Sequence, residues 1–506
     1  MRVPMFWTGD KQWRLRYVSP ITGVHTFRTE CSDAANATLH GAEGKIEVLP
    51  NKSQNKLYRH GPIRVSKNRR HFEHVDGKPF LWLGDTWWKC LAKRLSWEGF
   101  QELAADRKKK GFSVIQIVCG PYPDEGPFEP MWENEGGMPY HTKDFKVLNP
   151  EYWEYADRRL EHLIDSEMVP AIVGAWGRHD CDALKNVGVD GLKRHWRYLI
   201  ARYGAYPVFW VLAGEINGET LWGKGAWAPV AKYVRAIDPY QRPLTCHTAG
   251  AGGNLGPNGA VPSVDFAMVG GSHDERNAIS AGQAEMFKQA YDHKPPMPIL
   301  CGETCYEGHM QTGFQYIQRH MFWMRILLGA AGHTYGAAGI WHASVEGDPG
   351  CASSAFGGRK VYDWTTWREG MNYQGSTQLG LGKKLLEKYP WHRFEPHPEW
   401  AEPGSYAAGI PGEVRFIYQP RRNVYNWKGT VVKNLESDVT YSVFYFDPAT
   451  GRRFDQGIAK NVSSDAALDE SEAKGQKAQS YDYQAPDLPS PQDWVLVLEK
   501  VENENE

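Results

Sequence analysis

Residues 208–215 read VFWVLAGE, an apolar run that ends at a glycine followed by a carboxylate. A second run, PILCGE at 298–303, ends in the same way. Short continuous apolar runs are typical of strands that are buried on both faces of a parallel sheet. Glu215 and Glu303 therefore follow two buried strands, and their role depends on how the other strands are arranged around them.

The same pattern continues on both sides of these two runs. Short apolar segments alternate with helical segments, which favours βα units and a parallel sheet. We expect strands at 79–85, 113–119, 170–176, 208–215, 243–249, 264–271, 298–303 and 332–341. We expect helices at 96–111, 152–167, 191–204, 228–238, 283–292, 314–331 and 376–389. Eight such units predict an α/β fold, the (β/α)8 TIM barrel. An open doubly wound sheet is the alternative, but no GxGxxG motif follows any of the strands.

The segments before and after this region are expected to be rich in β-structure. Three period-two stretches, at 13–18, 23–30 and 45–50, indicate an N-terminal partial β-sandwich. Further strands at 413–420, 440–454 and 493–499 indicate a C-terminal β-sandwich, and the polar stretch 463–480 is expected to be a mobile loop. The predicted domains are therefore the partial β-sandwich 1–58, the barrel 59–398 and the C-terminal β-sandwich 399–506.

Composition narrows the range of partners. The chain has 506 residues, with 58 Lys and Arg against 60 Asp and Glu and no basic block, so nucleic acid is not an expected partner. No apolar run is long enough to span a membrane, and the first residues lack the apolar core of a signal peptide. We expect a cytoplasmic chain, or an exported one whose natural start lies upstream. The eight cysteines lack zinc-type spacing, so no metal or cofactor is predicted, and the oligomeric state is left open.

Polar and aromatic residues at the strand ends are the candidates for a binding site, because the carboxyl ends of barrel strands build the active site. Tryptophan and tyrosine are abundant, with 21 and 25 residues, and flat rings can serve as platforms for sugar rings. Polar groups beside them could bind sugar hydroxyls or donate to a catalytic carboxylate. The candidates are Asp85, Trp87, Trp88, Trp176, His179, His247, Tyr306, His333, Tyr335 and Trp341.

The two glutamates match the chemistry of glycoside hydrolysis. Strands four and seven of an eight-stranded ring lie on roughly opposite sides, so Glu215 and Glu303 are expected to face each other across the mouth. A glycosidase needs one carboxyl group to protonate the leaving oxygen and another to attack the sugar or activate water. A separation of about 5–5.5 Å gives retention of configuration, and one of about 6.5–9.5 Å gives inversion.

Several stretches resemble the apiosidase-like (β/α)8 glycoside hydrolases. They include LGDTWW at 83–88, VFWVLAGE at 208–215, PILCGETCYEG at 298–308 and GHTYGAAGIW at 332–341. The resemblance implies a hydrolase of plant- or algal-type oligosaccharides or polysaccharides, with Glu215 as the acid/base and Glu303 as the nucleophile of a retaining mechanism. It also implies motif roles for Asp85 on strand one and for His333 and Tyr335 on strand eight.

Two other classes of function remain open from the sequence. A polysaccharide lyase would use a tyrosine or histidine as the base and would leave an unsaturated sugar. A non-catalytic carbohydrate-binding barrel would keep its binding and its measured activities unchanged when Glu303 is replaced by glutamine.

Overall fold

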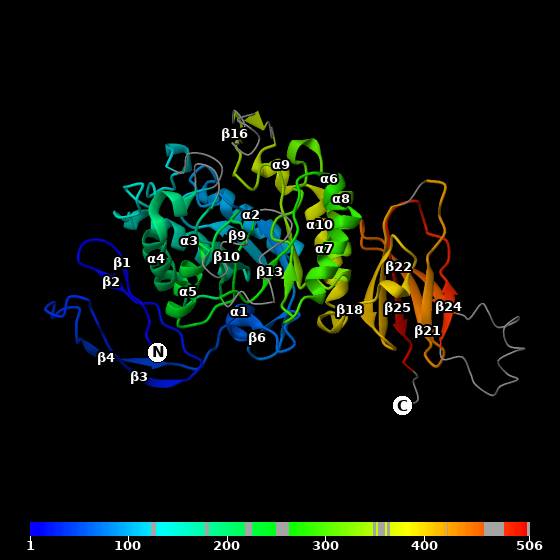
Figure 1. Ribbon diagram of the computed structural model, residues 1–506, viewed down its shortest axis with the longest axis horizontal. Helices are drawn as coiled ribbons and strands as arrows, with labels where there is room; N and C mark the ends of the chain where they lie inside the picture. Colours follow the sequence, from blue (N-terminus) through cyan, green and yellow to red (C-terminus); the bar gives the residue numbers. More distant parts are fainter. Residues whose placement is uncertain are drawn as a thin grey trace, which may run out of the picture.

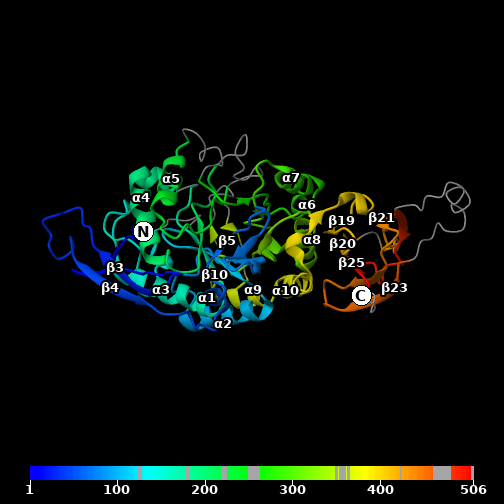
Figure 2. The ribbon, with the colours of Figure 1, turned by 90° about the horizontal axis from the view of Figure 1, so that it is seen from below.

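The structure of the protein is a computed structural model, shown in Figures 1 and 2. It describes residues 1–122, 128–177, 182–217, 225–248, 263–347, 351–352, 360–361, 365–421, 424–459 and 480–502.

Six of the eight predicted strands form one parallel sheet. It consists of β8 (Trp82–Thr86), β9 (Val114–Val118), β10 (Val169–Val173), β11 (Phe209–Val211), β12 (Leu244–Thr245) and β15 (Gly332–Tyr335). Their order is β12-β11-β10-β9-β8-β15. The strands from β8 to β12 thus lie side by side in chain order, and β15 lies beside β8. Every residue of these strands is buried, which explains the continuous apolar runs in the sequence.

The other two predicted strands, β13 (Ala267–Met268) and β14 (Ile299–Leu300), form a parallel pair. Backbone contacts connect this pair to the larger sheet at both margins. Cys301, after β14, forms a parallel bridge with His333 of β15. On the other side, the amide of Asp265 donates to the carbonyl of Leu244 at 2.8 Å. The eight strands therefore follow one another in chain order, with their carboxyl ends pointing the same way.

Helices follow most of the strands and pack against the outside of the sheet (Figure 1). The cap of α2 (Trp97–Lys110) shows why it begins and ends there: Ser96 accepts from the amide of Gly99, and Gly111 ends the helix at a φ of 89°. The remaining helices are α3 (Pro150–Asp165), α4 (Ala183–Tyr203), α5 (Ala228–Ile237), α6 (Glu275–Ala278), α7 (Ala281–Asp292), α8 (Gln315–Leu327), α9 (Trp367–Met371) and α10 (Gln374–Leu386).

A small antiparallel sheet lies at the amino ends of the strands. It contains β5 (Ile63–Val65), β6 (Phe72–His74) and β7 (Pro79–Phe80), and a short helix, α1 (Lys56–Arg59), precedes it. The Phe72 ring lies 5.2 Å from that of Phe209 and 5.0 Å from that of Phe266. The expected strand 79–85 is therefore divided between this basal sheet and β8.

The N-terminal segment forms two hairpins that extend along one side of the molecule (Figure 1). β1 (Phe6–Trp7) pairs with β2 (Trp13–Arg14), and β3 (Gly23–Arg28) pairs with β4 (Glu43–Val48). The expected strand at 13–18 is thus shorter than its alternation suggested. A partial sandwich over 1–58 stays a prediction.

The C-terminal segment forms a six-stranded antiparallel sheet and a two-stranded ladder. The sheet has the order β18 (Glu395–Pro396), β19 (Tyr406–Ile410), β20 (Val414–Gln419), β25 (Trp494–Lys500), β22 (Tyr441–Phe446) and β23 (Arg453–Ile458). The ladder pairs β21 (Val431–Glu436) with β24 (Ser480–Gln484), and a further short pair joins β16 (Cys351–Ala352) to β17 (Lys360–Val361).

The C-terminal segment packs on α8, where Arg319 donates to Asp493 at 2.9 Å. The chain turns between β22 and β23, where the amide of Asp447 donates to the carbonyl of Arg452 at 2.8 Å. Most of the loop expected at 463–480 lies outside the described residues, and the sandwich assignment and the domain boundaries stay predictions.

None of the helices in the described part of the chain has the length and apolarity needed to cross a membrane.

Candidate active site

Glu303 lies just beyond β14, and three elements supply hydrogen bonds to its carboxylate. His247, after β12, lies with Nε2 2.9 Å from Oε2. Tyr306 donates its hydroxyl to Oε1, and Trp88, after β8, donates Nε1 to the same oxygen at 3.4 Å. His273 adds an imidazole 3.7 Å from Oε1. The carboxylate is therefore held from both sides, and the Glu303 side chain as a whole is 16% exposed.

These neighbours decide the ionisation of Glu303. Burial alone would raise its pKa, but the charge and hydrogen bonds of His247 and His273 hold the pKa well below its ordinary value. Burial would likewise lower the pKa of His247, but the charge and hydrogen bond of Glu303 raise it, and the charge of Glu215 adds to this effect. Glu303 is thus held as an anion, and His247 lies within the field of both glutamates.

Glu215 lies beyond β11 in a backbone conformation that is uncommon for a residue with a side chain. Its φ is 50°, in the left-handed region. The half-buried carboxylate accepts from Nε1 of Trp176 at 3.2 Å. Strained backbone of this kind costs about 1–3 kcal/mol and often marks a functional site.

Gly214 is required at the preceding position because Trp176 occupies the space beside it. A Cβ added to Gly214 would lie 2.1 Å from the Trp176 ring. The two residues also form a parallel bridge. The glycine before Glu215 therefore lets the indole reach the carboxylate.

Three rings connect the two glutamates. Trp88 lies 5.4 Å from Trp176 and 5.9 Å from His247, and Trp176 lies 5.9 Å from His247, measured between ring centroids. Trp176 bonds to Glu215, whereas Trp88 and His247 bond to Glu303. The two Gly-Glu strand ends thus meet in one cluster of side chains.

A second group of rings lies next to Glu303. Tyr306 lies 4.7 Å from His273 and 6.2 Å from Trp341. His309 lies 5.3 Å from His273 and 6.0 Å from Trp341. Trp341 therefore lies near Glu303, and its role as a sugar platform stays a prediction.

The backbone that carries Glu303 is held from inside the sheet. Gln116, on β9, donates its amide to the carbonyl of Gly302 at 2.7 Å. The thiol of Cys301 donates to the carbonyl of Glu303 at 3.0 Å. Cys301 and Cys305 are free thiols in the structure. These contacts fix the strand end that presents the carboxylate.

Asp85 and Trp87 have surroundings that differ from those expected of sugar ligands. Asp85 is fully buried and accepts from Nε of Arg107, on α2, at 2.6 Å and from Nε1 of Trp87 at 2.8 Å. The Trp87 ring packs edge-on against Phe100 of α2 at 5.4 Å. Both side chains face the helix layer, so we leave them out of the site.

His333 and Tyr335 also lie on the helix side of their strand. His333 is fully buried, with its ring 5.8 Å from that of Phe322 on α8, and burial holds its pKa well below the ordinary value. Tyr335 is fully buried and donates its hydroxyl to Glu307 at 2.6 Å. Thr334, between them, points inward and accepts from Trp82 at 3.0 Å. We therefore leave His333 and Tyr335 out of the site as well.

One sequence-based candidate, His179, lies outside the residues that the structure describes. Gln116 and His309 were not predicted, although Gln116 is the one polar residue in the apolar run at 114–118. A lone amide in a buried strand needs a partner, and this was the signal that could have identified Gln116.

Comparison with known proteins gives two kinds of match. The model of the apiosidase-like catalytic domain matches residues 66–393. A solved structure described as a glycoside hydrolase is 19% identical, with a TM-score of 0.68 over 88% of this chain and 98% of its own. A glycoside hydrolase family 5 structure from Bacteroides vulgatus ATCC 8482 is 18% identical, with a TM-score of 0.68 over 87% and 94%. No curated protein sequence matches the chain. The two structures share the fold, and the family match spans both glutamates.

Proposed function

The chain belongs to the apiosidase-like family of catalytic domains and is a glycoside hydrolase, and we propose that it acts by a retaining mechanism. Glu303 is the nucleophile and Glu215 is the acid/base. The proposal takes the eight parallel strands as a closed (β/α)8 barrel, which the backbone contacts at both margins of the two sheets support.

One observation carries the assignment of Glu303. Its carboxylate receives hydrogen bonds from His247, Tyr306 and Trp88, and its pKa lies well below the ordinary value even though burial alone would raise it. A nucleophile must be ionised when the substrate arrives, and an acid must not be. A carboxylate held as an anion in a partly open site therefore suits attack on an anomeric carbon.

The surroundings of Glu215 suit the complementary role. It accepts a hydrogen bond from the neutral indole of Trp176, and it is only half buried. An acid/base must exchange its proton with a leaving group and then with water, so access to solvent helps. Its electrostatic effect on His247 supports a location near Glu303.

The reaction follows from these two roles. Glu303 attacks the anomeric carbon while Glu215 gives its proton to the departing glycosidic oxygen, and the glycosidic bond breaks as the glycosyl ester forms. Glu215, now a carboxylate, takes a proton from water, and the resulting hydroxide equivalent attacks the same carbon and releases Glu303. Two inversions give net retention.

The substrate proposed is a plant- or algal-type oligosaccharide or polysaccharide. Trp88, Trp176 and Trp341 lie in the ring clusters beside the carboxylates but are only 2%, 3% and 6% exposed, so a sugar ring would contact the small part of each indole that is accessible. A panel of aryl glycosides and oligosaccharides, read out by released sugar, identifies the sugar and the linkage.

Azide rescue tests the two roles separately. A Glu303→Gly variant, given azide and an activated aryl glycoside that the wild type cleaves, should form a glycosyl azide of inverted configuration. A Glu215→Ala variant should form one of retained configuration, because the glycosyl ester still forms. Absence of rescue in both variants, with both folded, would refute the assignment.

A further inference from the structure

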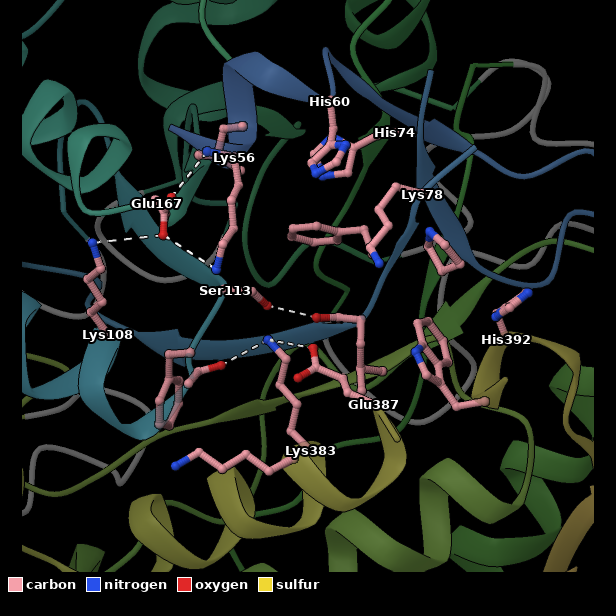
Figure 3. A pocket seen from close by; sticks show the side chains of 18 of the residues that line it. Lys56, His60, His74, Lys78, Lys108, Ser113, Glu167, Lys383, Glu387 and His392 are labelled. Carbon is pink, nitrogen blue, oxygen red and sulfur yellow. Dashed lines mark hydrogen bonds and ion pairs between the residues drawn. The ribbon is translucent and has the colours of Figure 1, made fainter. Parts of the chain in front are cut away.

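A cavity lies at the opposite end of the parallel strands from the two glutamates. Its volume is about 800 Å³, within the range of ligand-binding pockets. Leu81 and Ser113, which directly precede β8 and β9, form part of its wall. Side chains from α1, α2, α10 and the basal sheet surround it (Figure 3). We call it the basal pocket.

Cations dominate the lining of the basal pocket. Its side chains include six lysines and arginines but only two carboxylates, Glu167 and Glu387, in a chain whose overall charge is −2. Figure 3 shows lysines approaching the space from several directions. The six cations are Lys56, Arg59, Lys78, Lys108, Lys383 and Lys384.

The two carboxylates are already engaged. Glu167 lies 3.7 Å from the ammonium of Lys56 and 3.9 Å from that of Lys108. Glu387 lies 3.8 Å from Lys383, which also donates to a backbone carbonyl at 2.9 Å. Within the described residues, the structure records no ion pair for the other three cations of the lining. The pocket therefore keeps a surplus of positive charge.

Two histidines also line the pocket, and one of them, His60, lies 2.7 Å from the carboxylate of Asp76. The rings of His60 and His74 lie 5.4 Å apart. Burial lowers the pKa of His74, and His60 and Lys78 lower it further, although a hydrogen bond to the Gly61 carbonyl and the charge of Asp76 oppose them. An anion placed among these groups would relieve their mutual repulsion.

The rest of the lining offers apolar surface. Phe80, Tyr389 and Trp391 contribute rings to the wall of the basal pocket. Rings that adjoin cations suit a ligand that has both flat apolar faces and negative groups, as a charged sugar does. A single inorganic ion would leave most of the cavity and all of this apolar surface unused.

We propose that the basal pocket binds a short anionic oligosaccharide, with its carboxylate or sulfate groups among the lysines and a sugar face on the aromatic wall. The bound molecule lies at the other end of the strands from the catalytic glutamates. The proposal does not rest on the roles of Glu215 and Glu303.

The test compares two trisaccharides that differ only in charge. Binding of the β-1,4-linked glucuronate trimer and of cellotriose is measured by titration calorimetry with the full-length protein, with inorganic sulfate as a third probe. The variant Lys78→Gln/Lys384→Gln removes two exposed cations of the pocket, and Lys232→Gln/Lys288→Gln removes two exposed cations elsewhere. The second pair is the matched control for net charge.

We expect the charged trimer to bind the wild type and the control equally, and the pocket variant about three- to thirtyfold more weakly. Cleavage of an aryl glycoside should be unchanged in the pocket variant. Equal affinity of the pocket variant and the wild type would overturn the proposal, as would equal binding of cellotriose. Binding of sulfate as tight as that of the trimer would also overturn it, in favour of a site for a single ion.

Discussion

Replacing Tyr306 with phenylalanine removes one oxygen from the active site and leaves the ring that packs on His273 and Trp341. That oxygen donates to Oε1 of Glu303 and accepts from Trp88 at 2.8 Å. In the variant, Oε1 keeps the longer contact to Trp88, at 3.4 Å, and the imidazole of His273, at 3.7 Å. A hydrogen bond to a charged group is worth about 1.5–3 kcal/mol, so the anion should lose stability by about that amount. The pKa of Glu303 should rise accordingly.

The assay is kcat/KM against pH for an activated aryl glycoside. A loss of about 1.5–3 kcal/mol corresponds to about a 10- to 150-fold decrease, and the acidic limb should move to higher pH because the nucleophile must be ionised. Tyr335→Phe is the matched control, since it removes a buried hydroxyl on the helix side of the sheet. An unchanged acidic limb together with activity within twofold of the wild type would refute the role given to Tyr306.

Three further predictions follow from the same contacts. Gly214→Ala should displace Trp176, cost about 1–3 kcal/mol of unfolding free energy and reduce activity, as measured by denaturant unfolding and initial rates. Gly282→Ala should do neither, because its added Cβ would make only an ordinary contact, 3.6 Å from Oγ of Ser280. Asp85→Asn should cost up to about 3–5 kcal/mol, because it removes the fully buried one of the two carboxylates that pair with the Arg107 guanidinium and leaves only Asp106. Activity per folded molecule should stay unchanged; a lower kcat/KM at full folding would return Asp85 to the site. Because the pKa of Glu303 is lowered in the folded state, its ionisation stabilises the fold above about pH 4.5, and this contribution is lost as the pH falls through the folded-state pKa. The difference in unfolding free energy between the wild type and Glu303→Gln should therefore shrink on acidification. A difference that does not vary with pH would contradict the lowered pKa.

The strand positions could be predicted from the sequence, but the direction of each side chain could not. In a parallel sheet covered by helices both faces are buried, so the alternation that marks an inward face is hidden. Trp87 and Trp88 are adjacent in the chain, yet the first packs on α2 and the second reaches Glu303. His333 and Tyr335 faced the helices for the same reason.

Glu215 and Glu303 could be identified from the sequence because each is a carboxylate directly after an apolar strand, at the strand end where a barrel builds its active site. His247, Tyr306 and Trp88 could be identified as candidates from their strand ends. Their common partner, Glu303, could not, because it depends on loop paths that no local pattern encodes.

The basal pocket was not predicted at all. Its cations come from segments far apart in the sequence, and they meet only when α1 and α10 lie beside the amino ends of the strands.

Covalent trapping tests the assignment of Glu303 most directly. A 2-deoxy-2-fluoro glycosyl fluoride of the cleaved sugar should form a glycosyl ester that turns over slowly, and peptide mapping by mass spectrometry should locate the label on Glu303. A label on any other carboxylate, or turnover without an adduct and with inversion of configuration, would contradict the account.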